Sequence, residues 1–302
     1  TKEMIDEASD YYDEHFNNKD LFNRKGWEYI VNNCNGNLPI EIKAVPEGTC
    51  LPYKNVLFTL RNTDPKCFWL TNFLETLLVQ VWYTMTIATN SREMKKVIKK
   101  YMNDTCDNLN GIEFKLHDFG CRGVSSMETA ALGGSAHLIS FLGTDTVPAL
   151  KLTHKYYDST KSSGFSIPAT EHSTVTSWKE SGELKCMENF LDNHPSGIIA
   201  FVSDSYDIYN ACKNFWGEKL HDKIMNRNGT LVIRPDSGEP CEVLEKIFGI
   251  LEEKFPVTIN SKGYKVLDDH VRVIQGDGID INSMEKILKH LIQSWRDNIR
   301  LG

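Results

Sequence analysis

The sequence predicts an α/β protein with a parallel sheet and a polar site at one edge of that sheet. After about residue 110, short apolar runs alternate with helix-like stretches without a break. Such alternation is typical of parallel strands joined by right-handed helical crossovers. Five of the runs are followed closely by an aspartate: residues 112–116 before Asp118, 138–141 before Asp145, 198–202 before Asp204, 231–233 before Asp236 and 271–274 before Asp277.

A sixth run, residues 165–168, ends near Glu171 and His172. The carboxyl ends of parallel strands lie at the same edge of a sheet, so we expect the five aspartates and the histidine to meet there. Aspartate is a poor strand former and is costly to bury without a partner. Its repeated placement at strand ends therefore indicates a site rather than packing.

Six consecutive strand–helix units favour a closed or partly closed (β/α) barrel over a doubly wound sheet, because no dinucleotide-binding fingerprint is present. The first strand, residues 112–116, alternates apolar with charged residues, so one of its faces is expected to be wet. The predicted helices between and after the strands are residues 125–137, 147–157, 173–190, 206–224, 243–255 and 281–295.

The part of the chain before the alternation predicts a smaller α+β domain over residues 1–110, followed by the barrel domain over 111–302. An amphipathic helix near the N-terminus, a strand at 56–60 and a basic helix at 92–102 are expected. The most apolar stretch, residues 67–91, has Glu75 at its middle, so we predict a buried or interfacial helix and no membrane span. Its aromatic density also suits a subunit contact.

Composition limits the partners. The 302 residues are 40% hydrophobic and 25% charged, as in soluble globular proteins. A net charge of −7 argues against nucleic-acid or anionic-membrane binding, so any phosphate site has to be a local basic patch. The eight cysteines are scattered without metal spacing and residues 1–16 are charged throughout, which predicts reduced thiols, no signal peptide and a cytoplasmic location.

The stretch after the first run, residues 117–123, offers a planar ring at Phe119 and a cation at Arg122. Phe119 is suited to stacking on a planar ligand, and Arg122 to holding a phosphate, although a structural salt bridge explains Arg122 equally well. Asp145 fits either a helix N-cap or a ligand contact.

His172 can be a satisfied polar residue near a helix start, or a nucleophile whose ring Asp204 orients, as a carboxylate does in catalytic triads. Arg234 and Asp236 stand two positions apart on an extended segment and can face one side. Gly276 and Asp277 belong to a loop that allows close backbone approach, which is a weak signal by itself.

Two other enzyme classes also use a polar site at the strand ends of a barrel. A metal-dependent hydrolase barrel needs an H-x-H near its first strand, and none occurs among the nine histidines. A glycoside hydrolase needs a pair of carboxylates, which any aspartate-rich edge provides. The arginines and glycines fit that second reading less well.

Six segments in order resemble the nicotinamide phosphoribosyltransferase family: HDFGCRGVSS (117–126), GTDTV (143–147), EHST (171–174), SDSYDIYNAC (203–212), IRPDSG (233–238) and VIQGDGIDIN (273–282). The resemblance extends upstream through LPIEIKAVPEG (38–48) and TLRNTDPKCFWLTNF (59–73), so it covers nearly the whole chain.

The resemblance implies an irregular TIM-like (β/α) barrel of the type II phosphoribosyltransferase kind. It implies transfer of the 5-phosphoribosyl group from phosphoribosyl pyrophosphate to nicotinamide, giving nicotinamide mononucleotide and pyrophosphate in NAD salvage. Mg²⁺ would accompany the pyrophosphate, ATP would stimulate the reaction through a phosphohistidine, and the enzyme would be a homodimer with shared sites.

The resemblance also implies roles for single residues. His172 would be the residue phosphorylated by ATP, with Asp204 holding its ring. Phe119 would be one face of the nicotinamide sandwich, and Asp145 would accept a hydrogen bond from the carboxamide. Arg122 and Arg234 would hold substrate or phosphate groups, while Asp236, Gly276 and Asp277 would contact the ribose. Asp118 receives no role.

The chain departs from the family pattern at both ends. The family has a further N-terminal segment with a tyrosine that enters the partner's site, and it continues from 297–302 into a glycine-rich phosphate loop. We therefore expect a barrel that is incomplete at the C-terminus, with an inactive truncated product or a non-catalytic extracellular signalling form as alternatives to an active enzyme. Cys121 replaces a common aromatic residue, a change expected to be tolerated.

Overall fold

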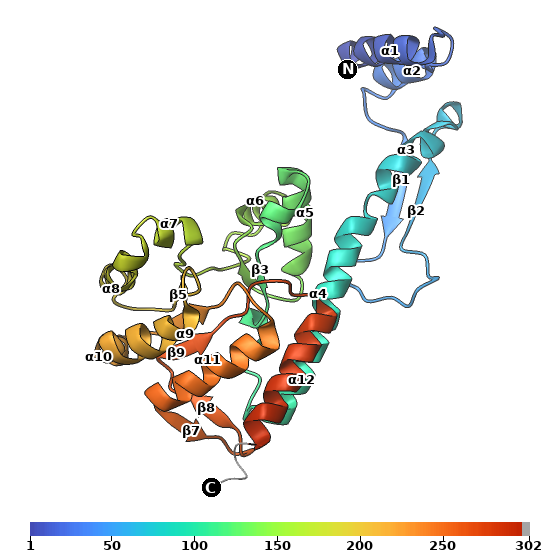
Figure 1. Ribbon diagram of the computed structural model, residues 1–302. Coiled ribbons are helices and arrows are strands. Elements are labelled where there is room, and N and C mark those ends of the chain that lie inside the picture. Colours follow the sequence, from blue (N-terminus) through green and yellow to red (C-terminus); the bar gives the residue numbers. More distant parts are fainter. Residues whose placement is uncertain (298–302) are drawn as a thin grey trace. The chain divides into compact units, whose positions relative to one another are not determined.

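The computed structural model describes residues 1–297 and divides the chain into two compact units, Thr1–Met85 and Thr86–Gly302. Both units mix helices with short strands, so the predicted α/β class is confirmed at that level (Figure 1). Among the described residues, no helix combines the length and the apolar character that a bilayer crossing requires. All eight cysteines are free thiols.

The first unit consists of a helical pair, an antiparallel hairpin and a third helix. Its elements are α1 (Lys2–Phe16), α2 (Arg24–Asn33), β1 (Ile40–Ala44), β2 (Phe58–Asn62), the 3-10 turn η1 (Pro65–Cys67), α3 (Leu70–Val79) and the start of α4 (Trp82–Thr105). Strands β1 and β2 pair from Ile40 with Asn62 to Ala44 with Phe58. A small core of Ile30, Cys67, Leu70 and Leu74 holds α2 and α3 together.

The apolar stretch 67–91 forms two helices rather than the single helix predicted. Helix α3 ends at Val79, and α4 begins at Trp82. Helix α3 buries Leu70 and Leu74 on one side. Phe73 and Leu77 lie beside these two residues on the helix surface and are exposed, so the apolar stripe of α3 is only partly covered.

The second unit alternates helices with short parallel strands. Its first half contains η2 (Ile112–Phe114), β3 (His117–Asp118), η3 (Gly120–Gly123), α5 (Met127–His137), β4 (Gly143–Thr144), α6 (Val147–Tyr156), α7 (His172–Thr176), η4 (Glu180–Gly182) and α8 (Glu183–Asn193). Its second half contains β5 (Ile199–Val202), α9 (Ile208–Asn210), the π-helix η5 (Ala211–Lys219), α10 (His221–Met225), β6 (Leu231–Arg234), α11 (Pro240–Lys254), β7 (Val257–Ile259), β8 (Lys265–Leu267), β9 (Val271–Val273) and α12 (Ile281–Asp297).

The parallel strands follow chain order but do not form a closed barrel. Strands β3 and β4 pair with each other, and β5, β6 and β9 form a separate three-stranded sheet. Isolated parallel bridges from Phe165 to Gly143 and from Ala169 to Ala200 place the extended segment 165–169 between the two sheets. The order β3, β4, 165–169, β5, β6, β9 therefore runs in one direction, with no closure among the described residues.

Two predicted strands are wrong, and both errors lie before the three-stranded sheet. Residues 112–114 form a 3-10 turn, and the first parallel strand starts later, at His117. Residues 138–141 turn out of α5, and β4 begins at Gly143. In both cases an apolar run packs its side chains without a partner strand: Ile112, Leu116 and Phe141 belong to a cluster with Ile98, Met102 and Met284. An apolar run in the sequence does not by itself show whether the segment forms a strand or a turn that packs in the core.

The helix predictions are accurate where one helix crosses between strands and inaccurate where the chain bends. Helices α5, α6, α11 and α12 match their predicted ranges to within a few residues. The predicted helix 173–190 is broken between α7 and α8 by a turn at which Lys179 has φ 60°. The predicted helix 206–224 contains a nine-residue π-helix. The antiparallel hairpin of β7 and β8 was not predicted.

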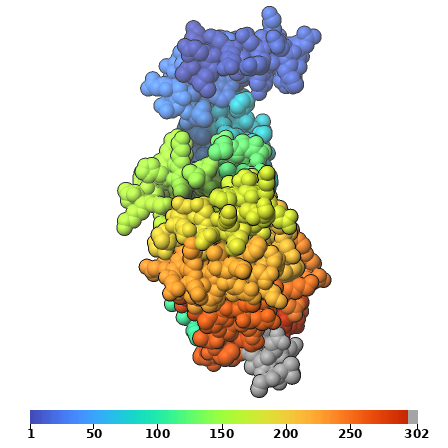
Figure 2. All heavy atoms as spheres, turned by 60° about the vertical axis from the view of Figure 1, so that its left-hand side comes forward, coloured from blue at the N-terminus to red at the C-terminus, as the bar shows by residue number. Residues whose placement is uncertain are grey.

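The main core lies between β5, β6 and the helices that follow them. Ile199, Phe201, Leu231 and Ile233 are fully buried, and Trp216 of the π-helix packs edge-on against Phe201 at 5.3 Å between ring centroids. The Trp216 indole donates to the Ser203 hydroxyl at 3.1 Å, which anchors the end of β5. Figure 2 shows the segment from α7 to α10 as a continuous yellow-to-orange stretch of this unit's surface.

The compact units divide upstream of the boundary expected near residue 110. The reason is that Ile98 and Met102, on the later part of α4, pack in the core of the second unit with Phe141 and Met284. The predicted functional domains 1–110 and 111–302 stay a prediction. The five C-terminal residues of the second of them, 298–302, lie outside the described residues.

The unpredicted hairpin caps the C-terminal end of α4 from a distant part of the chain. Asn260 donates through Nδ2 to the carbonyl of Thr105 at 2.6 Å, and its Oδ1 accepts from the backbone N–H groups of Lys262 and Tyr264. The N–H and hydroxyl of Ser261 both donate to Asp107. The last carbonyls of a helix have no partner within it, so these contacts satisfy groups that would otherwise need water.

We expect Asn260→Ala to lower the free energy of unfolding by about 1 to 3 kcal/mol, since it removes three hydrogen bonds from a half-buried side chain. Denaturant unfolding of the wild-type and variant proteins measures the difference. Asn193→Ala is the matched control, because Asn193 is exposed and its side chain bonds only to Asn189 in its own helix. Equal losses in the two variants would contradict the capping role.

Candidate functional site

Polar side chains from five neighbouring segments of the second unit gather at the carboxyl ends of the parallel strands. Three of them come from β3, β4 and the segment 165–169, and form what we call the Asp145 cluster: His117, Asp145 and Ser166. The others follow the 165–169 segment, β5 and β6, and form the His172 cluster: His172, Asp204, Asp236 and Ser237. The predicted gathering of polar residues at strand ends is thus observed for both groups.

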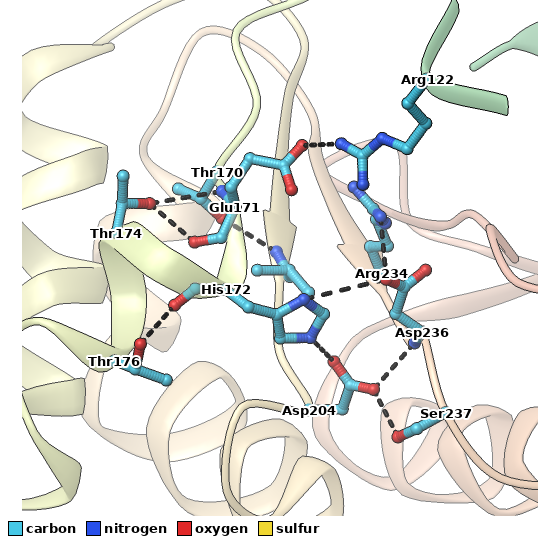
Figure 3. Close-up of polar contacts among 11 residues, drawn as sticks. Arg122, Thr170, Glu171, His172, Thr174, Thr176, Asp204, Arg234, Asp236 and Ser237 are labelled. Carbon is cyan, nitrogen blue, oxygen red and sulfur yellow. Dashed lines mark hydrogen bonds and ion pairs between the residues drawn. The ribbon is translucent and has the colours of Figure 1, made fainter. Parts of the chain in front are cut away.

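His172 lies between two carboxylates, as Figure 3 shows. Its Nε2 is 3.0 Å from Oδ1 of Asp204, and its Nδ1 is 3.8 Å from Oδ2 of Asp236. The histidine is the first residue of α7, and its side chain is 42% exposed. Nε2 is therefore held by a hydrogen bond, while Nδ1 faces Asp236 beyond hydrogen-bond distance.

Asp204 is the anchor of this cluster. Its side chain is 5% exposed, and its Oδ2 accepts from the backbone N–H of Asp236 at 2.9 Å and from the hydroxyl of Ser237 at 2.5 Å. Burial by itself would raise the pKa of Asp204, but the hydrogen bonds from Ser237, His172 and the Asp236 backbone outweigh it and lower the pKa below its usual value. Asp204 is thus ionised at neutral pH and presents Oδ1 to the histidine.

Arg234 and Asp236 face the same side of their extended segment, as their spacing predicts. The guanidinium Nη2 of Arg234 donates to Oδ2 of Asp236 at 2.9 Å. Gly276 packs directly against this pair, because a Cβ at that position would lie 3.0 Å from Oδ1 of Asp236 and 3.1 Å from Nε of Arg234. That Nε is buried and, among the described residues, has no hydrogen-bond partner. A larger residue at 276 would displace the arginine or the aspartate.

Asp145 is held by two donors from neighbouring strands. Nε2 of His117 lies 2.9 Å from Oδ1 of Asp145, and the hydroxyl of Ser166 donates to the same oxygen. Burial would raise the pKa of Asp145, but the hydrogen bonds from His117 and Ser166 outweigh it and lower the pKa. Asp145 does not cap α6, because no side-chain cap is present there. The N-cap alternative for this residue is therefore wrong.

Phe119 joins the two clusters. Its ring centroid is 4.8 Å from that of His117, with the planes tilted by 35°, and 5.5 Å from the guanidinium carbon of Arg234. An arginine over an aromatic face is an attractive cation–π contact. The ring expected to stack on a planar ligand is thus half-buried between His117 of the Asp145 cluster and Arg234, which donates to Asp236 of the His172 cluster.

Three further candidates have other surroundings. Arg122 is 77% exposed and reaches Oε1 of Glu171 at 3.4 Å, so it forms an exposed ion pair beside the His172 cluster (Figure 3). Asp277 is exposed, and within the described part of the chain its side chain makes no hydrogen bond or ion pair with either cluster. Asp118 is structural: it accepts from the N–H of Gly120 at 2.7 Å and from the hydroxyl of Thr144 at 3.2 Å, which ties β3 to β4.

Sequence reasoning missed three residues that contact the predicted ones. His117 and Ser166 bind Asp145, and Ser237 binds Asp204. Ser237 follows the end of β6, whereas His117 opens β3 and Ser166 lies inside the extended segment 165–169. A search for polar residues just after strand ends would therefore have found only Ser237, and the sequence does not reveal the partner of any of the three side chains.

The described residues contain no group of three or more His, Cys, Asp or Glu side chains placed to hold a metal ion. The two clusters offer instead one ionised carboxylate beside an aromatic ring, and one histidine between two carboxylates. The first arrangement suits a neutral planar ligand with an N–H group. The second suits a nucleophilic or proton-transferring imidazole.

Comparison with known proteins agrees with this chemistry. Residues 114–302 match the nicotinate phosphoribosyltransferase (NAPRTase) family, and residues 1–42 match the nicotinamide phosphoribosyltransferase N-terminal domain. A protein of Xanthomonas campestris pv. campestris (strain 8004) named nicotinamide phosphoribosyltransferase is 49% identical over 286 residues, which are 93% of this chain and 61% of that protein.

Two more distant relatives carry the same name. The protein of Acinetobacter baylyi is 36% identical over 277 residues, covering 85% of this chain and 55% of its own length. That of Mycoplasma genitalium is 33% identical over 273 residues, covering 85% and 58%. This chain thus spans between 55% and 61% of the length of these curated relatives. Because the family match covers both clusters and more than half of the sequence, the chain belongs to the nicotinate phosphoribosyltransferase (NAPRTase) family.

Proposed function

We propose that this chain carries the site at which nicotinamide receives the 5-phosphoribosyl group of phosphoribosyl pyrophosphate, giving nicotinamide mononucleotide and pyrophosphate for NAD salvage. The observation that carries the proposal is an ionised Asp145 held beside the ring of Phe119 by His117, which contacts both. The names of the relatives support nicotinamide as the acceptor.

Asp145 favours the amide over the acid for an electrostatic reason. Nicotinamide is neutral and its carboxamide N–H donates to a carboxylate, whereas nicotinate is an anion at neutral pH and is repelled by one. Two like charges at hydrogen-bond distance in a partly desolvated site cost more than a single lost hydrogen bond. The aromatic ring of Phe119 then provides the stacking surface for the pyridine.

The ribosyl transfer forms a bond from the pyridine nitrogen to the anomeric carbon, while the bond to pyrophosphate breaks. The sugar acquires oxocarbenium character, which the carboxylate of Asp236 would stabilise. Arg122 and Arg234 would hold substrate phosphates. Mg²⁺, when bound with the pyrophosphate, would neutralise the leaving group. Asp277 would act on the ribose through the loop that starts at Gly276.

ATP would be coupled through His172. Because an ionised carboxylate only accepts hydrogen bonds, the neutral ring donates its Nε2–H to Asp204, and the lone pair then stands on Nδ1. Nδ1 makes no hydrogen bond among the described residues, and we propose that it attacks the terminal phosphorus of ATP, so that the N–P bond forms as the bond to ADP breaks. Ser237 keeps Asp204 oriented for this step.

We further propose that the parallel strands belong to a TIM-like barrel of the type II phosphoribosyltransferase kind. The observation in favour is a cavity of about 540 Å³ lined by β9 residues, including Val273, and by Lys115 and Leu116, which lead into β3. The two ends of the strand order thus line one mostly apolar space.

We also propose a homodimer, since Phe68, Phe73 and Leu77 leave an exposed apolar face near and along α3. The free cysteines are compatible with a cytoplasmic protein.

Asp145→Asn tests the function directly. Since His117 and Ser166 both donate to Oδ1, the new amide is expected to keep its oxygen there and to present its NH₂ group to the ligand. That donor suits the carboxylate of nicotinate, so the ratio of kcat/KM for nicotinamide to that for nicotinate should fall by about 10-fold or more. Product formation is measured with both pyridines, in the presence of Mg²⁺, phosphoribosyl pyrophosphate and ATP.

The control is Asp222→Asn, on a side chain that is 97% exposed. It should leave the ratio unchanged. An unaltered ratio in Asp145→Asn would remove Asp145 from the assignment. Absence of nicotinamide mononucleotide formation by the wild-type protein would overturn the proposed reaction.

A further inference from the structure

We propose that His117 and Ser166 are positioning residues that set the choice between amide and acid, by occupying one oxygen of Asp145 and leaving the other for the ligand. This inference rests on the proposed function and extends it. Neither residue carries a role in the family resemblance. Both were identified by their contacts in the structure.

The two donors converge on a single atom. Nε2 of His117 lies 2.9 Å from Oδ1 of Asp145, and the Ser166 hydroxyl donates to that same oxygen. Among residues 1–297, no hydrogen bond reaches Oδ2. Convergence follows from the topology: His117 pairs with Gly143 in β4, and Phe165 bridges to Gly143 from the other side, so three adjacent segments each place one side chain at the same edge.

The position of His117 is tightly constrained. Its side chain is 16% exposed, and a Cβ added at Gly143 would lie 2.8 Å from its Nδ1. Since the carboxylate can only accept, the neutral imidazole carries its hydrogen on Nε2 and keeps a lone pair on Nδ1 against the Gly143 backbone. The glycine thus allows the ring to sit where its donor reaches Asp145.

His117 also contacts the ring that is expected to stack on the pyridine. Its centroid is 4.8 Å from that of Phe119. The imidazole of His117 therefore contacts both the stacking surface and the carboxylate that recognises the carboxamide, and so helps to fix the distance between them. The distance between these two recognition elements matters because a pyridine ring and its carboxamide form a rigid unit, and a misplaced carboxylate loses the hydrogen bond without losing the stack.

Loss of the donors should change the charge of Asp145 as well as its position. Burial raises the pKa of this carboxyl, and the hydrogen bonds from His117 and Ser166 lower it. Without them, Asp145 is both less restrained and more readily protonated. A protonated carboxyl can donate to nicotinate instead of repelling it, and a rotated carboxylate no longer holds its charge against the nicotinate carboxylate, so selectivity should fall while stacking persists.

The test measures binding of nicotinamide and of nicotinate by calorimetry or saturation-transfer NMR, in the absence of turnover. The variants are His117→Phe, which removes the donor, His117→Gln, whose amide N–H can reach from a similar position, and Ser166→Ala. We expect the ratio of the two dissociation constants to fall about 10-fold in His117→Phe and a few-fold in Ser166→Ala. His117→Gln should keep most of the wild-type ratio, which a merely structural role of the ring would not produce.

His154→Phe is the matched control, because His154 is exposed and bonds only to the carbonyl of Ser159. Wild-type selectivity in both His117→Phe and Ser166→Ala would overturn this inference and leave the proposed function intact. Wild-type protein that prefers neither pyridine would overturn both. If His117→Phe does not fold, Ser166→Ala decides, since Ser166 is exposed and its replacement leaves no cavity.

Discussion

Replacing His172 with alanine is expected to abolish ATP-dependent phosphorylation of the protein and ATP stimulation of turnover, while basal synthesis persists. Nδ1 of His172 is the only atom proposed to accept the phosphoryl group, so incorporation of label from γ-labelled ATP should fall by at least about 100-fold. A phosphohistidine is lost in acid and survives in alkali, so label in the wild-type protein should show that stability. Full ATP coupling in His172→Ala would remove the residue from the scheme.

Asp204→Asn sharpens this experiment without removing the histidine. Oδ2 of Asp204 accepts from the Asp236 N–H and from Ser237, so the amide oxygen of asparagine should take that place and turn the NH₂ group toward Nε2 of His172. The ring must then accept at Nε2 and carry its proton on Nδ1, which is the wrong tautomer for attack. We expect about a 100-fold loss of labelling. Asp192→Asn, exposed on α8, is the control.

Glu183→Gln is expected to stabilise the protein at alkaline pH. Glu183 is 2% exposed, and its buried Oε1 has no hydrogen-bond partner among the described residues. Burial, with help from the charges of Glu180 and Asp207, raises its pKa from 4.5 to about 7. Between these two values the folded state binds a proton that the unfolded state has lost. The free energy of unfolding therefore falls as the pH rises through this window.

Glutamine carries no charge, so the advantage of the variant should grow between pH 4.5 and pH 7, be complete above pH 7 and vanish below pH 4.5. The expected gain at pH 8 is on the order of 2 to 3 kcal/mol. Denaturant unfolding of both proteins at pH 5 and pH 8 measures it. Glu128→Gln, on an exposed side chain, should show no comparable dependence. A gain of equal size at both pH values would mean that packing, not ionisation, is responsible.

The family and much of the second unit were readable from the amino-acid sequence. The runs that became β5 and β6 are short, mostly apolar and bounded by turn residues. Strand β5 is buried on both faces, as is typical of a strand inside a parallel sheet. The run that became β9 has Arg272 between two valines. Ordered motifs around Asp145, His172 and Asp236 predicted the family that the comparisons confirm. Aspartates at strand ends predicted where the polar site lies.

The first strands and the bends were not readable in this way. Strands β3 and β4 have two residues each, and they exist because they pair with each other and with the 165–169 segment. The helix breaks near Lys179 and at the π-helix depend on packing against neighbouring elements, which local propensity does not encode. The hairpin that caps α4 depends on contacts with residues more than 150 positions away.

The candidate site likewise has features that the sequence determines and features that only packing determines. Which side chains stand at strand ends is a property of the sequence, because side-chain period and strand direction follow from local pattern. The spacing of adjacent strands decides which oxygen of Asp145 accepts the hydrogen bonds from His117 and Ser166. It also decides which nitrogen of His172 is bonded to Asp204. A hydrogen bond changes with tenths of an ångström, and such distances are set only when the segments pack together.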